Sequence, residues 1–196
     1  MRPARIAALA LVALSALASP LAAGPHLPDL SIAVGGTGAV GGDLDSGGFS
    51  ASGTAMWPVE GPWSFGFTGF VDDMGNRLVS VNDGGVPPTP LGTLEDRHRF
   101  VFGGGWQMAA RLSDWGRWQP SASAFWTAAR VQDDARGVVF GATSTMGVGL
   151  GFSLRRPVLQ RSTVGVGLRY HHLFDDVVDG YMSAAVEWGW RFGKTP

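Results

Sequence analysis

Apolar residues alternate with small or polar residues along much of the second half of the chain. Over residues 138–155, the even positions are almost wholly apolar, whereas the odd positions are mainly glycine, threonine and serine. The same two-residue period recurs over residues 163–174 and 181–192. Because successive side chains of a β-strand point to opposite faces, each segment predicts a strand with one apolar face and one small or polar face.

Five earlier segments alternate in the same way, but less regularly. They are residues 30–40, 49–57, 63–71, 100–112 and 118–131. The last of these is ambiguous, because Phe125 lies in its small-residue register and Pro120 lacks the amide that a central strand would use. With these five, the pattern predicts eight strands, each long enough to cross a membrane at a tilt, which takes about 9–11 residues.

The connections between these segments alternate in length. Short turns at 58–62, 113–116 and 156–161 alternate with longer connections at 41–48, 72–97, 132–137 and 175–180. Outer-membrane barrels have short periplasmic turns and longer extracellular loops. An open sheet edge in lipid would leave backbone amides unpaired. We therefore predict an all-β chain that forms an eight-stranded antiparallel transmembrane β-barrel with an up-and-down meander.

Aromatic residues gather near the predicted turns, as an interfacial girdle would. The predicted periplasmic girdle comprises Trp57, Trp63, Trp118, Trp188, Trp190 and Phe192. Candidates for the opposite belt are Phe49, Phe100, Tyr170, Phe174 and Tyr181.

The N-terminus has the layout of a cleavable secretory signal peptide. Arg2 and Arg5 precede an apolar stretch at 6–18, and small residues allow cleavage after Ala18 or Ala23. We assign residues 1–23 to the signal peptide and 24–196 to one barrel domain. The expected location is the outer membrane of a Gram-negative bacterium.

Composition favours lipid over water around the strands. Charged residues make up 16% of the chain, against about 25% in ordinary soluble domains, and Lys194 is the only lysine. The soluble alternative, a lipocalin-like barrel, would expose the small-residue faces to water without charges. The net charge of −1 gives no indication of nucleic-acid binding, and the absence of cysteine excludes thiol catalysis.

The face predicted to line the lumen carries six large polar residues. They are Gln107, Arg111, Arg169, His171, Glu187 and Arg191. If the last hairpin pairs Phe174 with Met182, Arg169 lies directly opposite Glu187. Such a pair can be a structural plug that fixes strand register, or a gate that lets small solutes through. The narrow bore of an eight-stranded barrel favours the plug.

The C-terminal segment carries a family resemblance. Residues 165–172, Gly-Val-Gly-Leu-Arg-Tyr-His-His, are followed by a loop and by alternating residues that run to Trp190-Arg191-Phe192. This arrangement resembles the last hairpin of the OmpA-like and OmpX-like outer-membrane barrels. The resemblance implies an aromatic-rich final strand that the barrel-assembly machinery reads as a signal. In this chain four residues, 193–196, follow the final aromatic residue, which departs from the usual family ending.

Several short motifs suggest chemistry but lack a required part. His171 and His172 are adjacent on a strand, so they point to opposite faces and cannot readily share a metal ion. Lipid A deacylase barrels have a His-x-Ser motif, and neither histidine here is followed by that serine. The glycine-rich run at 36–41 precedes no helix that could hold a dinucleotide, and the segment 43–47 lacks the later glutamate of a calcium loop. We therefore expect no catalytic residue, cofactor or metal.

These observations favour a non-enzymatic barrel that serves in envelope structure or surface interaction through its extracellular loops, of which 72–97 is the longest. A narrow porin-like channel and a lipid A-modifying enzyme are the alternatives. The expected partners are outer-membrane lipid, lipopolysaccharide and the barrel-assembly machinery, and we expect a monomer.

Overall fold

The computed structural model describes residues 27–39, 47–81, 93–135, 138–174 and 180–192. The predicted signal peptide, the calcium-loop-like segment up to residue 46 and the centre of the long connection lie outside the described residues. The described part of the chain contains no helix long and apolar enough to cross a membrane.

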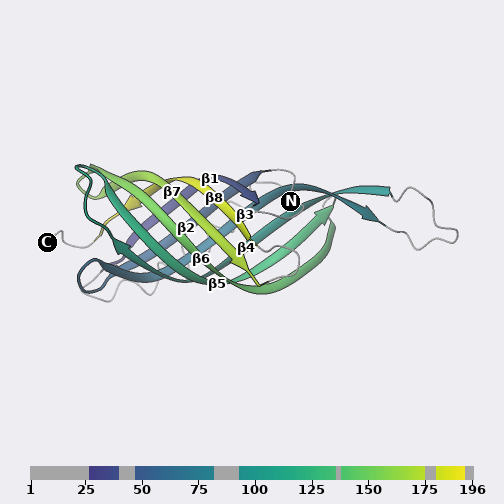
Figure 1. The fold of residues 1–196 in the computed structure, drawn as a ribbon, viewed down its shortest axis with the longest axis horizontal. Coiled ribbons are helices and arrows are strands. Elements are labelled where there is room, and N and C mark those ends of the chain that lie inside the picture. Colours follow the sequence, from purple (N-terminus) through teal and green to yellow (C-terminus); the bar gives the residue numbers. More distant parts are fainter. Residues whose placement is uncertain (1–26, 40–46, 82–92, 136–137, 175–179, 193–196) are drawn as a thin grey trace.

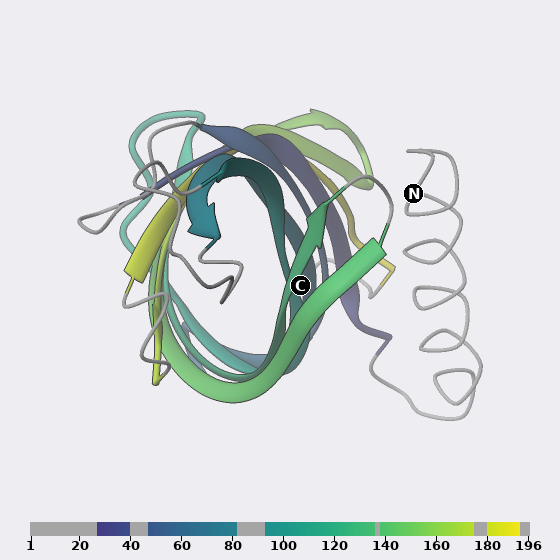
Figure 2. The ribbon, with the colours of Figure 1, turned by 90° about the vertical axis from the view of Figure 1, so that its right-hand side faces the viewer.

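Eight strands form one closed antiparallel barrel, which confirms the predicted fold (Figures 1 and 2). They are β1 (Asp29–Ala39), β2 (Gly48–Pro58), β3 (Trp63–Val81), β4 (Thr93–Arg111), β5 (Gln119–Ala135), β6 (Val138–Leu159), β7 (Ser162–Leu173) and β8 (Gly180–Trp190). Each strand pairs with its neighbour in sequence, and β1 pairs with β8 from Leu30↔Trp190 to Ala39↔Tyr181. The closure removes both sheet edges, as a lipid surrounding requires.

Strands β3 and β4 are longer than predicted, with 19 residues each. Most of the predicted loop at 72–97 is therefore strand, and the hairpin extends beyond the rest of the barrel (Figure 1). A register shift between Asp73 and Asn76 marks the departure from the wall, and Gly75 adopts a φ of 78° there. Outside the membrane both faces of a strand meet water, so the two-residue period that predicts strands is lost.

The β2–β3, β4–β5 and β6–β7 connections lie at one end of the barrel and the other four at the opposite end (Figure 1). Their lengths alternate less regularly than predicted, because β5 ends at Ala135 and β6 begins at Val138, so most of the predicted connection at 132–137 is strand. The connection between β6 and β7 is shorter than predicted, because β6 continues through a register shift to Leu159. We call the end that carries the β2–β3, β4–β5 and β6–β7 connections the turn end, and the opposite end the loop end; we expect the turn end to face the periplasm.

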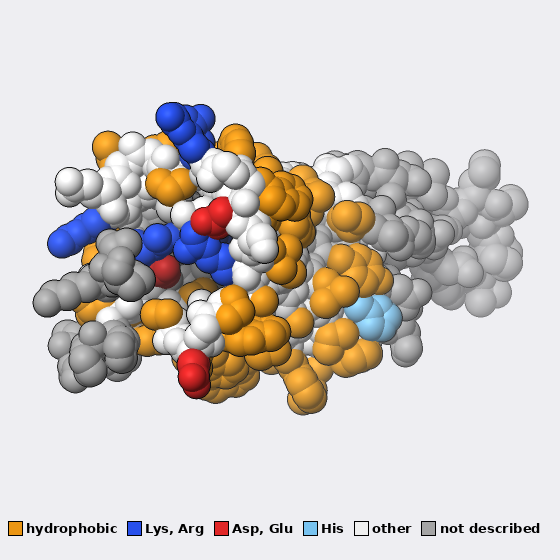
Figure 3. Space-filling view, turned by 60° about the vertical axis from the view of Figure 1, so that its left-hand side comes forward, with side chains coloured by type: hydrophobic (Ala, Val, Ile, Leu, Met, Phe, Trp, Pro, Cys, Tyr) orange, Lys and Arg blue, Asp and Glu red, His pale blue; other side chains and the backbone are white. Residues whose placement is uncertain are grey.

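The two faces of the strands differ as the alternation predicts. Large apolar side chains remain exposed on the outer wall, among them Trp106, Trp126, Leu150 and Val186 at 51%, 59%, 64% and 61%. Figure 3 shows this apolar wall and the charged side chains that gather at the turn end. A wall of this composition is stable only against hydrocarbon, so the barrel is a membrane-spanning one.

Phe125 points into the lumen and is 6% exposed. It fits there because Gly149, on the neighbouring strand, has no side chain: a β-carbon at Gly149 would lie 2.1 Å from the Phe125 ring. Phe125 therefore shares the inward face of β5 with the small residues, and Gly149 on β6 leaves space for its ring.

Candidate functional site in the barrel lumen

The inward side chains form two layers along the barrel axis. Near the loop end lies an aromatic plug, which we define as Phe70, Phe125, His171 and Tyr181. Near the turn end lies a polar layer around Glu187, next to a cavity.

The plug is built on the ring of His171. This ring stacks on Tyr181 with centroids 4.5 Å apart and planes at 5°. Phe70 and Phe125 flank it, with centroid distances of 4.9 and 4.8 Å. All four side chains are between 0% and 6% exposed. An eight-stranded barrel is only wide enough for side chains to fill, and these four rings fill its cross-section at this level.

The position of Tyr181 corrects a prediction. We expected this residue in the outer aromatic belt, but its side chain points inward and is 0% exposed. Its hydroxyl donates a hydrogen bond of 2.7 Å to Oδ2 of Asp72, and Ser50 donates one of 2.6 Å to Oδ1. These bonds can form only when the Tyr181 side chain points into the lumen, on the same face of β8 as Ser183. They tie the plug to strands β2, β3 and β8.

Towards the loop end, an ion pair lies above the plug. Arg99 on β4 donates to both carboxylate oxygens of Asp133 on β5, at 2.6 and 2.8 Å. Arg99 is 3% exposed. Two parallel bonds of this kind fix geometry as well as adding energy, so the pair joins β4 to β5 where the outer wall ends.

The polar layer is centred on the carboxylate of Glu187, which is 3% exposed. Arg155 places its Nε 2.7 Å from Oε2 of Glu187, and Ser153 donates to the same oxygen at 2.5 Å. Arg155 also donates from Nη2 to Ser31 at 3.3 Å. The carboxylate therefore has a charged partner and a neutral donor, both from β6.

The partner of Glu187 is a second correction. We predicted that Phe174 pairs with Met182, which would place Arg169 opposite Glu187. In the structure Tyr170 pairs with Met182, so Arg169 lies opposite Ser183 and Glu187 lies opposite Gly165. The register of a hairpin depends on the number of residues in its connection, and that number cannot be read from the alternation.

Gly165 explains why Arg155, and not Arg169, is the ion-pair partner of Glu187. It lies on β7, between Glu187 on β8 and Arg155 on β6. With no side chain on Gly165, Arg155 reaches across it: a β-carbon there would lie 3.0 Å from Cγ of Arg155. Arg155 was not among the predicted lumen residues, although it continues the odd register of Gly151 and Ser153.

The other predicted lumen residues surround the cavity at the turn end. Gln107 is buried, and its Oε1 has no hydrogen-bond partner. Arg169 donates from Nη1 to Thr68 at 3.4 Å. Arg191 donates to Gln119 at 3.2 Å. The cavity beside them measures about 130 Å³.

Arg111, predicted in the lumen, lies at the rim of this cavity, where its side chain is 47% exposed. It forms an ion pair with Asp114 in the adjoining turn, at 2.8 Å. The structure thus brings Arg155, Arg169 and Glu187 together in the polar layer, places His171 in the plug, and leaves Arg111 at the mouth.

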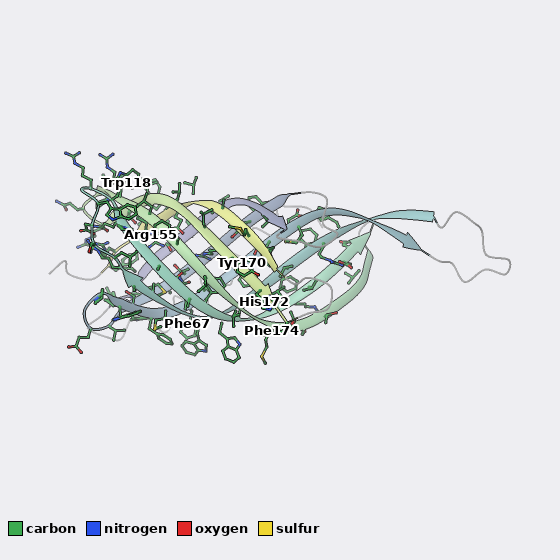
Figure 4. All side chains as sticks on the ribbon, viewed as in Figure 1. Phe67, Trp118, Arg155, Tyr170, His172 and Phe174 are labelled. Carbon is green, nitrogen blue, oxygen red and sulfur yellow. The ribbon has the colours of Figure 1, made fainter. Side chains whose placement is uncertain are left out.

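The residues of the predicted periplasmic girdle lie towards the turn end. Trp63, Trp118, Trp188 and Phe192 are 48%, 39%, 41% and 44% exposed, while Trp57 and Trp190 are partly buried. Figure 4 shows Trp118 at this end, and Tyr170, His172 and Phe174 further towards the loop end. The rings of Trp57 and Phe67 meet edge to face at 6.2 Å.

The two adjacent histidines point to opposite faces. His171 is buried in the plug, whereas His172 packs edge to face against Phe174 with centroids 5.3 Å apart. Within the described ranges no three His, Cys, Asp or Glu residues form a group that could hold a metal ion.

Comparison with known proteins supports the fold but assigns no specific activity. No protein-family model matches the chain, and a comparison with curated proteins found no relative. Among solved structures, the chain is similar to Neisserial surface protein A, with a TM-score of 0.59 and 13% identity over 84% of this chain and 96% of that one.

Two further solved structures are similar to this chain. A major outer membrane protein from Thermus thermophilus has a TM-score of 0.56 and 9% identity, over 84% of this chain and 99% of that one. The N-terminal β-barrel domain of Pseudomonas aeruginosa OprF has a TM-score of 0.52 and 10% identity, over 84% and 97%. The chain therefore has the fold of small outer-membrane barrels, and its apolar wall fits that membrane.

Proposed function

We propose that this outer-membrane barrel is a non-enzymatic envelope protein that acts at the cell surface through the β3–β4 hairpin. The observation that supports this role is the pairing of the hairpin strands. The pairing of β3 with β2 ends at Asp72, whereas the pairing of β3 with β4 continues to Val81. The β4–β5 pairing likewise ends at His98.

Residues 76–81 and 93–97 consequently pair only with each other among the described strands. A two-stranded ribbon has two edges whose backbone N–H and C=O groups are free to bond another extended chain. Strand addition at such an edge is a recurring way of binding peptides and proteins. The hairpin therefore offers an extended protein segment a place to bind outside the membrane.

The hairpin can be tested by replacing residues 76–97 with a short turn. We expect the shortened barrel to fold and insert, because residues 76–81 and 93–97 pair only with each other among the described strands, but to lose binding at the cell surface. The measurement is the settling rate and surface adhesion of Gram-negative cells that display each form. Glu187→Gln, which changes only the lumen, is the matched control and should adhere like the parent. Unchanged adhesion by folded, hairpin-deleted barrels would contradict the proposal.

The aromatic plug argues against the channel alternative. We expect planar bilayers that contain the purified protein to remain silent, and to remain silent after Glu187→Ala. The reason is that the plug lies nearer the loop end than the polar layer does. Its ring packing involves neither Glu187 nor Arg155. Stepwise conductance that appears in the Glu187→Ala variant would instead identify the ion pair as a gate and support a narrow pore.

The final hairpin and the outer wall bear on the family, the assembly and the neighbours of the barrel. The final hairpin favours membership of the OmpA-like and OmpX-like barrels and assembly by the barrel-assembly machinery. The apolar wall favours lipid and lipopolysaccharide as neighbours of a monomeric barrel. The lipid A-modifying alternative has a direct test: incubation of the protein with lipopolysaccharide should leave its acyl-chain mass unchanged.

A further inference from the structure

The cavity at the turn end is lined by more basic than acidic side chains. Its lining contains four arginines and two carboxylates. They are Arg111, Arg155, Arg169, Arg191, Asp29 and Glu187. Three of the arginines have carboxylate partners: Arg155 with Glu187 at 2.7 Å, Arg191 with Asp29 at 3.5 Å, and Arg111 with Asp114 at 2.8 Å.

Arg169 is the arginine of this lining that has no carboxylate at ion-pair distance among the described residues. Its neighbours on β6 and β8 are Gly151 and Ser183, which carry no charge. Within the part of the chain that the structure describes, its guanidinium has one hydrogen bond, to the Thr68 hydroxyl at 3.4 Å, and no carboxylate within 4.0 Å. Glu187 and Asp72 act on this guanidinium electrostatically without a direct bond, so most of its N–H donors are available to a ligand in the cavity.

A second group in the same cavity lacks a partner. Gln107 is 8% exposed, and its Oε1 has no hydrogen-bond partner in the described structure. A side-chain amide presents two donors at one end and an acceptor at the other, and its two orientations are nearly equivalent in shape. Turned through 180°, Gln107 would present N–H donors at the place of the unpartnered oxygen.

We propose that this cavity binds a phosphate group. Arg169 would supply the charge, because a guanidinium donates in a planar fork that matches the oxygens of phosphate. Gln107 would supply a neutral donor. The volume of about 130 Å³ leaves room for waters beside the anion, since one water needs about 10–15 Å³. The inference is independent of the hairpin's role.

Two kinds of molecule could bring a phosphate group to the turn end. Inorganic phosphate can enter from the periplasm through the mouth where Arg111 lies. Alternatively, the headgroup of a phospholipid can reach over the short turns from the inner leaflet. Both sources present the same oxygens to Arg169, so the site is the same and only the carrier differs.

The first test is calorimetric titration of the folded protein, in an uncharged detergent free of phospholipid, with inorganic phosphate. We expect saturable binding of one phosphate per barrel. Arg169→Gln should weaken it at least tenfold, because a hydrogen bond to a charged group contributes about 1.5–3 kcal/mol. Arg156→Gln is the matched control: it removes the same charge from an exposed residue of β6 that does not line the cavity, and binding should be retained.

Gln107→Leu provides a second variant with no change in charge, and we expect weaker binding from it too. Heat-dependent gel mobility establishes that each variant is folded before titration. In phospholipid nanodiscs, a headgroup in the cavity would block added phosphate and give a bound phosphorus resonance that Arg169→Gln removes. Either source supports the proposal. It is overturned if the parent protein binds neither, or if folded Arg169→Gln binds as the parent does.

Discussion

Glu187→Ala is expected to lower the free energy of unfolding by about 3 kcal/mol. The substitution leaves Arg155 without its partner, and removal of one member of a buried ion pair costs about 3–5 kcal/mol. We expect the lower end of this range because the Arg155 side chain is 28% exposed and can be hydrated by water in the cavity. Urea unfolding of the protein in lipid vesicles, followed by tryptophan fluorescence, measures the change.

Two further variants separate the charge from the packing. Glu187→Gln keeps the shape and an acceptor for Ser153, so its loss should be smaller than that of the alanine variant. The double variant Glu187→Met with Arg155→Met removes both charges and should recover most of the stability, since buried pairs are often replaceable by apolar residues of similar volume. A double variant as unstable as Glu187→Ala would show that the unpartnered arginine is not the cause.

Gly149→Val is expected to destabilise the barrel by about 3 kcal/mol or to prevent its closure. A β-carbon at this position would lie 2.1 Å from the Phe125 ring and 2.4 Å from the carbonyl oxygen of Tyr170. The ring is held in the plug, so either the plug or the wall must move, and overpacking of this kind typically costs about 1–3 kcal/mol. The fraction of protein with the mobility of the folded form in unboiled gels measures the effect.

Gly141→Val is the matched control, because it lies on the same strand with no atom within 4 Å of its β-carbon position. We expect it to change stability by no more than about 0.5 kcal/mol. Adding Phe125→Ala to Gly149→Val should restore part of the folded fraction, since it removes one of the two contacts. Equal effects at the two glycines would mean that strand propensity, and not the contact with Phe125, decides the outcome.

The strands at 138–155, 163–174 and 181–192 could be predicted because lipid and lumen select opposite residue types. Outward positions along the closed wall meet hydrocarbon and inward ones meet a narrow interior, so the residue types alternate there. The continuation of β3 to Val81 was not predictable in this way. Residues 72–81 do not alternate apolar with polar side chains, so no two-residue period marks this continuation.

The lumen was predictable as a set of inward residues, but not as a set of contacts. The alternation places Glu187 and Arg169 inside, yet their partners depend on the strand register and on which neighbours are glycine. Gly165 allows Arg155 to reach Glu187. Gly149 similarly allows Phe125 to join the plug. Such pairings between neighbouring strands require the register of the closed barrel.

The plug also affects how much sequence change the connections at the loop end can tolerate. Because Phe70, Phe125, His171 and Tyr181 pack together within the wall, we expect the permeability barrier not to depend on the connections at the loop end. A peptide inserted between Val81 and Thr93 should therefore leave the membrane sealed to small dyes. The surface of the barrel can accordingly diversify, or carry a foreign epitope, without loss of the barrier that the cell needs.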